Sequence, residues 1–488
     1  MILKSVSNVD ILGMFKDKFY ITTAIDYINA KPHIGHAYEK VASDVLARYF
    51  ASKIGRDKVW FLTGTDEHGA KIAQAAEASG TPIEEFAKQT AATFSFAWDQ
   101  LNLQYDRFIR TTDSDHINKV EEILVKIKEK GYVYEADYEG LYCVGHEAFI
   151  TERDLVNGLC PEHKTTPEKI KEKNWFLKTS EFTKTIQEKI EKDELEIWPA
   201  ERKNEVLGLL EQGFNDTAIS RPNVKWGIPL PWDKEQTVYV WVDALINYLT
   251  GAKDGKKDWW PADVHIIGKD IIKFHCIIWP AILLAAGLDL PKKIVVHGYL
   301  TVGGEKISKS LGNVIDPNDW VAKYGSDAVR YLLLREVAFG QDGDVSEEKL
   351  KARYEGELAN GLGNLVSRIT TLVENNLGGE IKIEKIDPNN PESEEIHKLI
   401  ENFEFHAALA KIWQWVIWAN KTTDEKKLWE LAKTDLDEFK KIAGQILGAI
   451  EIIAKELSPF IPETSKKILD HLAKEKITKA EPLFPKIS

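Results

Sequence analysis

His33 and His36 are the first residues in the sequence whose types and spacing suit chemistry, and they follow Pro32 closely. Pro32 fixes φ where a helix would begin, so both imidazoles are expected on one face of the first helical turn, with Gly35 leaving the surface between them bare. Such a surface at the positive end of a helix dipole suits the phosphates of a purine nucleotide. The alternative is a pair of surface histidines near a helix cap.

Lys306 and Lys309 form the second candidate group, in a Lys-Ile-Ser-Lys-Ser segment that Gly303 and Gly304 precede. Two lysines in a glycine-flanked loop suit a mobile clamp on a polyphosphate, because lysine supplies a point charge without demanding rigid geometry. The alternative is an ordinary solvated loop.

Four short apolar runs are the elements that must position these side chains. They are Phe19–Ala24, Val59–Thr63, Val264–Ile267 and Ile294–Val296. Runs of this kind, bounded by turn signals and separated by helical patterns, predict buried parallel strands. We therefore predict an α/β fold with a Rossmann-type, doubly wound parallel sheet. Ligands of such sheets lie beyond the carboxyl ends of the strands, where His33, Asp66 and Asp270 fall.

Two Cys-x-x-His pairs lie between the second and third runs. Cys143 and His146 form the first pair, and Cys160 and His163 form the second. Two thiolates and two imidazoles at this spacing suit a closed, structural Zn²⁺ site. The alternative is a remnant loop with an inert thiol pair. The third cysteine, Cys276, is expected in the core of an apolar helix.

The composition excludes several classes of protein. The 488 residues, 43% of them hydrophobic, suggest about three globular domains. Three cysteines and the lack of a secretory signal after Met1 favour a reducing cytoplasm. The longest apolar stretch, 274–287, contains His275 and Pro280 and is too short to span a membrane, so no membrane partner is expected. The net charge of −13 argues against a protein coated in nucleic acid, yet it allows one basic face.

The two motifs together, each beside its expected strand, resemble the signatures of the class I aminoacyl-tRNA synthetases. Ile307 stands where that family usually has Met, which leaves both lysines in place. Between His33 and Lys306 the spacing of 306 − 33 = 273 residues leaves no room for the large editing insertion of the valyl, leucyl and isoleucyl enzymes. The segment 19–27 lacks the cysteine that a cysteinyl enzyme would place there.

Four further stretches resemble the methionyl-tRNA synthetases along nearly the whole chain. They are Ala-Ile-Asp-Tyr at 24–27, Thr-Gly-Thr-Asp-Glu-His-Gly at 63–69, Tyr-Val-Trp-Val-Asp-Ala-Leu-Ile-Asn-Tyr at 239–248 and Gly-Lys-Asp-Ile-Ile-Lys-Phe-His at 268–275. The resemblance implies a methionine pocket formed by Ile25, Tyr27, Trp241, Ala244, Leu245, Tyr248, Ile271 and His275. It also implies that Asp66 receives the substrate's ammonium group. An aromatic slot suits a flexible thioether, although each aromatic residue taken singly is more typical of a core.

The reaction that this resemblance implies has two steps and no covalent enzyme intermediate. Methionine's carboxylate attacks the α-phosphate of ATP to give methionyl-adenylate and pyrophosphate, and the terminal ribose of tRNA(Met) then takes the methionyl group. Catalysis would depend on positioning and charge stabilisation, with Mg²⁺ bridging the ATP oxygens. The implied ATP-binding residues are His33, Gly35, His36, Gly268, Asp270, Lys306 and Lys309, of which His33, His36, Lys306 and Lys309 are the catalytic ones.

The C-terminal third follows helical spacing over 358–372, 406–420 and 436–457, which predicts a bundle. Residues 363–368 and 419–429 resemble the family's two anticodon elements. On that match Asn364 and Arg368 would hydrogen-bond anticodon bases and Trp429 would stack on one. The family usually has Pro where Leu428 stands, and it commonly has Cys where the predicted zinc ligand His146 stands.

Five regions follow from these expectations. Residues 1–129 and 239–300 form the two halves of the catalytic sheet domain, 130–238 an insertion with a zinc knuckle, 301–345 the lysine loop and stem-contact region, and 346–488 the helical anticodon-binding domain. The chain ends soon after 459–462, so we expect no appended dimerising module and a monomer.

Two alternatives to a methionine-activating enzyme are open. A catalytically silent tRNA-binding paralogue would share the fold but would not need both histidines and both lysines. A nucleotidyltransferase of the cytidylyltransferase type shares the His-x-Gly-His pattern but would be far shorter and would lack the helical bundle.

Overall fold

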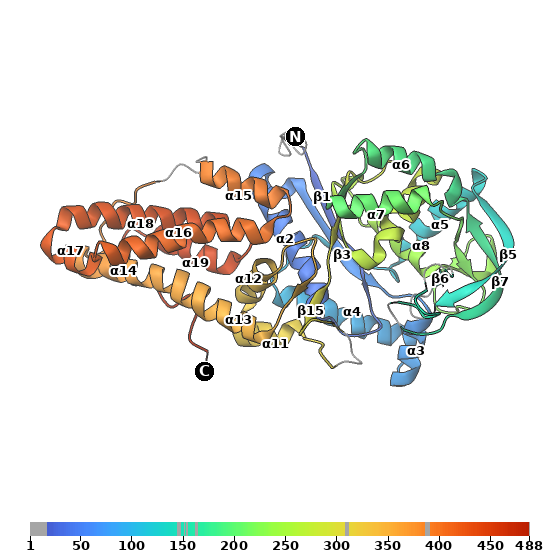
Figure 1. Ribbon diagram of the computed structural model, residues 1–488, viewed down its shortest axis with the longest axis horizontal. Coiled ribbons are helices and arrows are strands. Elements are labelled where there is room, and N and C mark those ends of the chain that lie inside the picture. The colour runs from blue at the N-terminus through green and yellow to red at the C-terminus, as the bar shows by residue number, and fades with distance from the viewer. Residues whose placement is uncertain are drawn as a thin grey trace.

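The computed structural model describes residues 17–143, 148–150, 152, 155–161, 164–307, 312–385 and 391–487. The molecule is elongated, with a sheet domain at its centre (Figure 1). The C-terminal helices extend from one side of this domain, and the long strands β5 and β7 lie at the opposite end. Lys309, Ser308, His146 and His163 lie outside the described residues.

The central sheet has seven strands, and every pairing in it is parallel. Its strands are β1 Phe19–Thr23, β2 Asp26–Tyr27, β3 Val59–Asp66, β4 Arg107–Arg110, β8 Glu196–Trp198, β13 Val264–Gly268 and β14 Lys293–His297. The order is β2-β3-β1-β13-β14-β8, with β4 also paired to β3. All four strands expected from the apolar runs are confirmed, because β1, β3, β13 and β14 correspond to them. A strand covered on both faces must be apolar throughout, which accounts for the continuous runs.

Helices flank the sheet. They include α2 Ile34–Ile54, α3 Ala70–Ser79, α4 Ile83–Gln100, α5 Ser114–Glu129, α8 Val240–Leu245, α9 Asn247–Thr250 and α10 Trp279–Ala286. α5 buries Val120, Ile123, Leu124 and Ile127, the i, i+3, i+4, i+7 face of an amphipathic helix. Gly131, at φ 80°, then allows the chain to turn toward the insertion.

The region 130–238 contains two small antiparallel sheets and also returns to the main sheet. One small sheet has the order β6-β5-β7-β9 and the other β10-β12-β11. Their strands are β5 Val133–Cys143, β6 Ala148–Ile150, β7 Glu168–Leu177, β9 Thr217–Ala218, β10 Ser220–Arg221, β11 Pro229–Leu230 and β12 Asp233–Val238. Between them, α6 Thr183–Glu191 and α7 Ala200–Glu211 flank β8, whose Ile197 pairs with Ile294 of β14. Part of this region therefore completes the edge of the central sheet.

From residue 300 onward three short strands alternate with helices, and the helices predicted for the C-terminal third are confirmed. The elements are β15 Leu300–Val302, β16 Glu305–Lys306, α11 Pro317–Tyr324, α12 Ser326–Glu336, β17 Gly343–Asp344, α13 Glu347–Arg353, the π-helix η7 Tyr354–Gly363, α14 Asn364–Leu377, α15 Pro391–Glu401, α16 Phe405–Glu425, α17 Leu428–Thr434, α18 Leu436–Leu457 and α19 Pro462–Leu472. Their apolar faces share one core. Among the helices in the described ranges, none has the length and apolarity needed to cross a membrane.

Arg330 of α12 joins the helical region to the sheet domain. Its side chain is fully buried and forms an ion pair of 2.6 Å with Asp44 of α2. The guanidinium also donates to three backbone carbonyls, those of Leu101 at 3.2 Å, Pro459 at 2.9 Å and Phe460 at 2.8 Å. One cation thus fixes the ends of α4 and α18 against α2.

Arg330→Met should lower the free energy of unfolding by about 3 kcal/mol, because three buried carbonyls lose their donor and Asp44 loses one of its partners. Urea unfolding followed by circular dichroism measures this loss. Lys323→Met, which breaks the exposed pair with Glu347, is the control and should barely move the urea midpoint. Equal losses in the two variants would contradict the proposed importance of Arg330.

Candidate active site

A cavity of about 390 Å³ opens where β1, β3, β13 and β14 end, against the start of α2. It brings together the sequence-predicted residues of both halves of the sheet domain. The predicted residues that line it are Ile25, Tyr27, His33, Gly35, His36, Asp66, Trp241, Ala244, Leu245, Tyr248, Gly268, Asp270, Ile271, His275 and Lys306. Lys309, the remaining predicted phosphate ligand, is not among the described residues.

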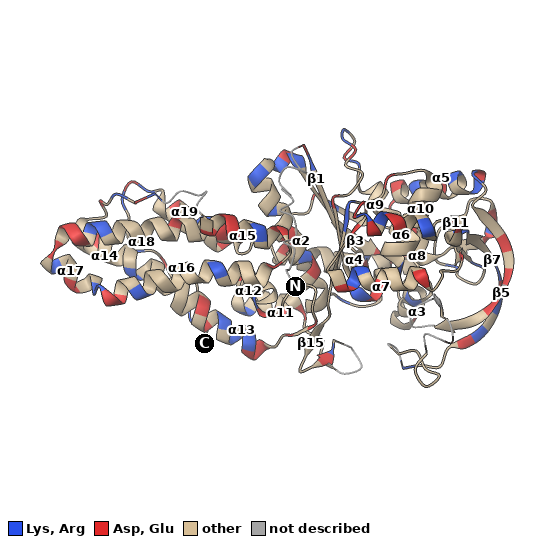
Figure 2. Cartoon of the chain, turned by 45° about the horizontal axis from the view of Figure 1, so that its top comes forward, with Lys and Arg blue, Asp and Glu red and all other residues tan. Residues whose placement is uncertain are grey.

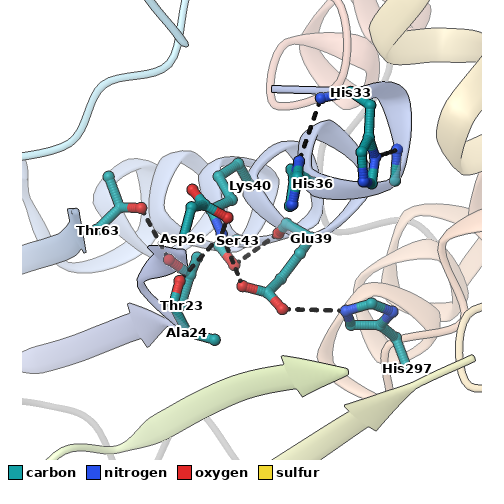
Figure 3. A network of polar contacts seen from close by, with 11 residues as sticks. Thr23, Ala24, Asp26, His33, His36, Glu39, Lys40, Ser43, Thr63 and His297 are labelled. Atoms are coloured by element: carbon teal, nitrogen blue, oxygen red, sulfur yellow. Dashed lines mark hydrogen bonds and ion pairs between the residues drawn. The ribbon is translucent and has the colours of Figure 1, made fainter. Parts of the chain in front are cut away.

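The two histidines of the first motif cap helix α2 reciprocally (Figure 3). His33 Nδ1 accepts the Gly35 N–H, and His36 Nδ1 accepts the His33 N–H, both at 3.1 Å. A nitrogen that accepts carries no proton, so Nε2 is the protonated nitrogen of each neutral ring. A Cβ on Gly35 would meet the His33 ring at 2.9 Å, which accounts for the glycine. Both rings therefore offer an Nε2–H donor.

Burial keeps these two rings uncharged. Burial first, and the positive charge of Lys40 second, lower the pKa of His33 from 6.5 to about 4. Burial and the neighbouring His33 hold the pKa of His36 well below its ordinary value. The first motif thus presents neutral hydrogen-bond donors and a helix N-terminus to the cavity, rather than two cations.

Lys40 lies one turn beyond His36 on α2 and is buried in the cavity wall. Its ammonium donates to the Ala24 carbonyl at 2.9 Å, to Asp26 at 2.7 Å and to Glu39 at 3.1 Å (Figure 3). Three protons thus meet three acceptors. Burial raises the pKa of Asp26 to about 7 even though Lys40 opposes the shift.

The same chain of charges continues to the end of β14. His297 Nε2 lies 3.0 Å from Glu39 Oε2, and Nδ1 lies 2.8 Å from the Gly298 carbonyl oxygen. A carbonyl oxygen only accepts, so His297 Nδ1 donates to Gly298. Burial alone would raise the pKa of Glu39, but Lys40 and His297 together lower it. This network of contacts from Lys40 to His297 links helix α2 to the ends of two strands.

Asp26, Glu39 and Lys40 also line the cavity, although the sequence did not lead us to expect them there. Helical spacing was the available signal, since position 40 follows His36 by one turn on the same face. The residue types, however, argued against a buried position in the cavity wall, because lysine and glutamate are rarely fully buried.

Aromatic rings form one wall of the cavity's apolar side. Trp241 of α8 stacks on Phe274, with ring centroids 4.0 Å apart and planes 10° from parallel. Phe274 begins a π-helical turn, η5 Phe274–Ile278, that precedes Pro280. Proline lacks the N–H that a regular helix would use here, which favours the wider turn. That turn carries His275 into the cavity lining.

His275 is held in one neutral form. Its Nδ1 lies 3.1 Å from the Ile271 carbonyl, which can only accept, so Nδ1 bears the proton. Nε2 then accepts the Tyr248 hydroxyl at 2.7 Å. Burial lowers the pKa of His275 to about 4, so no charge arises beside the apolar pocket near neutral pH.

Asp66 adds a carboxylate to the cavity lining. It ends β3, is 7% exposed and lies opposite Tyr27 in the parallel register of β2 and β3. A buried carboxylate beside an uncharged slot fits an amino acid bound by its ammonium group and its side chain.

The three predicted anticodon residues lie in the helical region, away from the cavity. Asn364 and Arg368 are one turn apart on α14, and both are at least partly exposed. Arg368 pairs with Asp424 at 2.6 Å, and its guanidinium carbon lies 5.9 Å from the ring centroid of Trp429. Trp429 is 41% exposed, so the structure brings Arg368 and Trp429 together on a surface.

Two of the four predicted zinc ligands can be placed. Cys143 and Cys160 are both buried, at 1% and 0% exposure. The Cys160 N–H donates to the Thr165 carbonyl, and the Cys160 carbonyl accepts the Lys164 N–H. Within the ranges that the structure describes, which omit His146 and His163, no cluster of three or more metal-ligating side chains occurs.

A parallel sheet with capped histidines after its first strand and a lysine hairpin after its last defines the class I tRNA synthetases. The family model described as "tRNA synthetases class I (M)" matches residues 19–166 and 163–370. Methionine–tRNA ligase of Thermotoga maritima is 41% identical, over 94% of this chain and 76% of that protein. The Mycobacterium tuberculosis ligase is 40% identical, over 93% and 92%. The chain therefore belongs to the methionine–tRNA ligase family.

Solved structures agree with this assignment. Mycobacterium tuberculosis methionyl-tRNA synthetase in complex with methionyl-adenylate matches with a TM-score of 0.90 at 38% identity, over 96% of this chain and 100% of that one. The free-state structure of the same enzyme matches with a TM-score of 0.81 at 34% identity, over 96% and 98%. The family resemblance expected from the sequence is thus confirmed, as is the parallel-sheet fold followed by helices.

The buried neutral His275 should make stability depend on pH. Its pKa is about 4 in the folded chain against 6.5 as the ordinary value, so the unfolded chain binds the proton more tightly between these values. The free energy of unfolding is therefore highest above pH 6.5 and falls as the pH drops toward 4. Replacing this residue in His275→Asn should reduce the loss between pH about 7.5 and about 5 by roughly 2 kcal/mol, measured by urea unfolding. Parallel pH profiles in the two proteins would show that this histidine does not contribute.

Proposed function

We propose that the cavity activates L-methionine with ATP and transfers the methionyl group to tRNA(Met). The observation that carries this proposal is that one cavity holds both parts of the chemistry. The Nε2–H donors of His33 and His36 lie on its polar side, and an uncharged aromatic slot ending at Asp66 forms the other side. The membership of the methionine–tRNA ligase family supports the same reaction.

The amino acid would bind in the apolar half. Asp66 would receive the ammonium group, while Trp241, Tyr248 and His275 surround the thioether. Sulfur–aromatic contacts favour a thioether over a branched aliphatic chain in such a slot. The neutral His275 and its bond to Tyr248 keep the pocket free of charge, which lowers the cost of burying an apolar substrate.

ATP would lie across the start of α2. The Nε2–H groups of His33 and His36 would donate to phosphate oxygens, and Gly35 lets the phosphates approach the helix N-terminus. Lys306 and Lys309 would stabilise the leaving pyrophosphate, while Gly268 and Asp270 would hold the adenosine. Mg²⁺ would accompany ATP and neutralise part of its charge. Methionine's carboxylate then attacks the α-phosphate, so the chain needs no nucleophile of its own.

The exposed pair of Arg368 and Trp429 supports tRNA binding by the helical region. A guanidinium beside an exposed indole can hydrogen-bond one unpaired base and stack on another, and Asn364 one turn away adds an amide. Along the bundle helices, Asp and Glu positions are interspersed with Lys and Arg positions rather than separated from them (Figure 2). A local basic contact is therefore compatible with the net charge of −13.

The five-region division predicted from the sequence is retained as part of this proposal, with 346–488 as the anticodon-binding domain. The small number of cysteines, three in 488 residues, supports a cytoplasmic location. A monomer is the oligomeric state that we propose, and light scattering measures it.

Methionine-dependent exchange of pyrophosphate into ATP tests the function, with other amino acids as the comparison. Asp66→Asn should raise the KM for methionine by about 100-fold, because a charged partner of the ammonium is lost. Lys306→Ala should lower kcat of exchange by about 100-fold and leave the KM for methionine unchanged. Lys466→Ala, at an exposed position of α19, is the matched lysine control. A parent protein without methionine-dependent exchange would favour the silent paralogue.

Cys143, His146, Cys160 and His163 are also proposed to hold a structural Zn²⁺. The buried thiols of Cys143 and Cys160 fit this role. Protein purified without added metal should contain about one zinc per chain, and chelation should lower its melting temperature. Cys143→Ser should abolish metal content, whereas Cys276→Ala should retain it. Parent protein free of zinc would identify the segment as a relic.

A further inference from the structure

The hairpin that carries Lys306 has a fixed register. β15 and β16 pair antiparallel with Thr301 opposite Lys306, and only Gly303 and Gly304 form the turn. Both glycines have left-handed φ, 64° and 77°, as a tight two-residue hairpin turn requires. The strand pairing therefore determines which face of the hairpin Lys306 occupies.

Asp344 fastens this hairpin to the rest of the domain. Its Oδ1 accepts the Gly304 N–H at 2.7 Å and the Thr301 hydroxyl at 3.0 Å. β17 also pairs with β15 in parallel, with Gly343 beside Leu300. The backbone at Lys306 is thus held, and the position of its ammonium depends on the flexible stem.

Tyr299 lies where this register directs the Lys306 side chain. It precedes Thr301 by two residues, so it is the diagonal cross-strand neighbour of Lys306 on the same face. The Lys306 ammonium lies 4.3 Å from the centroid of the Tyr299 ring, which is within cation–π distance. Lys306 is exposed and Tyr299 is half-buried. The surrounding residues therefore restrict the ring more than they restrict the lysine side chain.

A second ammonium uses the same ring. Lys269 Nζ also lies 4.3 Å from the Tyr299 centroid, and it is 2.7 Å from both carboxylate oxygens of Asp342. Asp342 in turn accepts the Tyr299 backbone N–H at 2.8 Å. Lys269 stands between Gly268 and Asp270, so the ring connects the turn proposed to hold adenosine with the lysine proposed to meet pyrophosphate.

We propose that Tyr299 is a positioning residue whose ring holds the Lys306 ammonium at the edge of the cavity through a cation–π contact. This inference rests on the proposed role of Lys306 in meeting the leaving pyrophosphate. A long lysine side chain in water samples many rotamers, and each must be given up when the transition state forms. The ring restricts these rotamers beforehand, so less entropy is lost when pyrophosphate departs.

This role requires the aromatic face of Tyr299 but not its hydroxyl group. Tyr299→Phe keeps the aromatic face, whereas Tyr299→Leu keeps the bulk and removes it. In methionine-dependent pyrophosphate exchange, Tyr299→Phe should stay within about twofold of the parent, and Tyr299→Leu should lose about tenfold in kcat. The KM for methionine should not change in either variant. Equal rates in the two variants would overturn the proposal.

Fluorinated phenylalanines at position 299 provide a measurement that packing alone would not affect. Each added ring fluorine weakens the negative face of the ring while nearly conserving its shape, so kcat of exchange should fall in steps with fluorination. A flat series would overturn the cation–π role, even if Tyr299→Leu proves too unstable to assay.

A double-mutant cycle separates this inference from the function on which it rests. In a Lys306→Gln background, Tyr299→Leu should cost less than about twofold, because no ammonium remains at that position to be held. Additive losses would overturn the role of Tyr299. Normal exchange in Lys306→Gln alone would instead contradict the proposed role of Lys306.

Discussion

The buried ammonium of Lys40 is the interaction on which the cavity depends. It binds the Ala24 carbonyl and the carboxylates of Asp26 and Glu39, and Glu39 continues the contact to His297. The first strand's end, helix α2 and the end of β14 are thus joined by one network of hydrogen bonds and ion pairs. A buried cation tolerates few arrangements of its acceptors, because losing any acceptor leaves a desolvated charge. The need to keep every acceptor of the Lys40 ammonium in place therefore fixes the distance between the two halves of the cavity.

Burial then decides the protonation state of the histidines that line the cavity. His33, His36 and His275 are all held neutral because desolvation disfavours the imidazolium form. The interior thereby offers directed hydrogen-bond donors and an uncharged slot. The buried Lys40 ammonium is balanced by its acceptors, and a further positive charge is carried at the rim by Lys306 on a short hairpin, where water reduces the cost of keeping it. An uncharged slot with a positive charge at its rim suits a substrate that has an apolar end and a highly charged end.

Much of the fold could be predicted from the sequence, because its signals are local. The run 436–457 became helix α18 with the same bounds, and the four apolar runs became parallel strands of the sheet. The strand β8 was not expected, since its three residues within 130–238 carry no pattern that distinguishes an edge strand from the small sheets nearby. Its partner β14 lies about a hundred residues further along the chain, and only tertiary pairing connects them.

The sequence by itself indicated the motif residues that line the cavity, because motif spacing and the strand-end rule both act through local geometry. The tertiary structure decided how those residues are charged and held. Arg330 bonds to Pro459, 129 residues away, and Glu39 bonds to His297, 258 residues away. Such contacts depend on burial and on the three-dimensional positions of distant segments, which no local pattern encodes. The contact between the Lys306 ammonium and the Tyr299 ring also depends on the three-dimensional structure, since it follows from the register of the hairpin rather than from the motif.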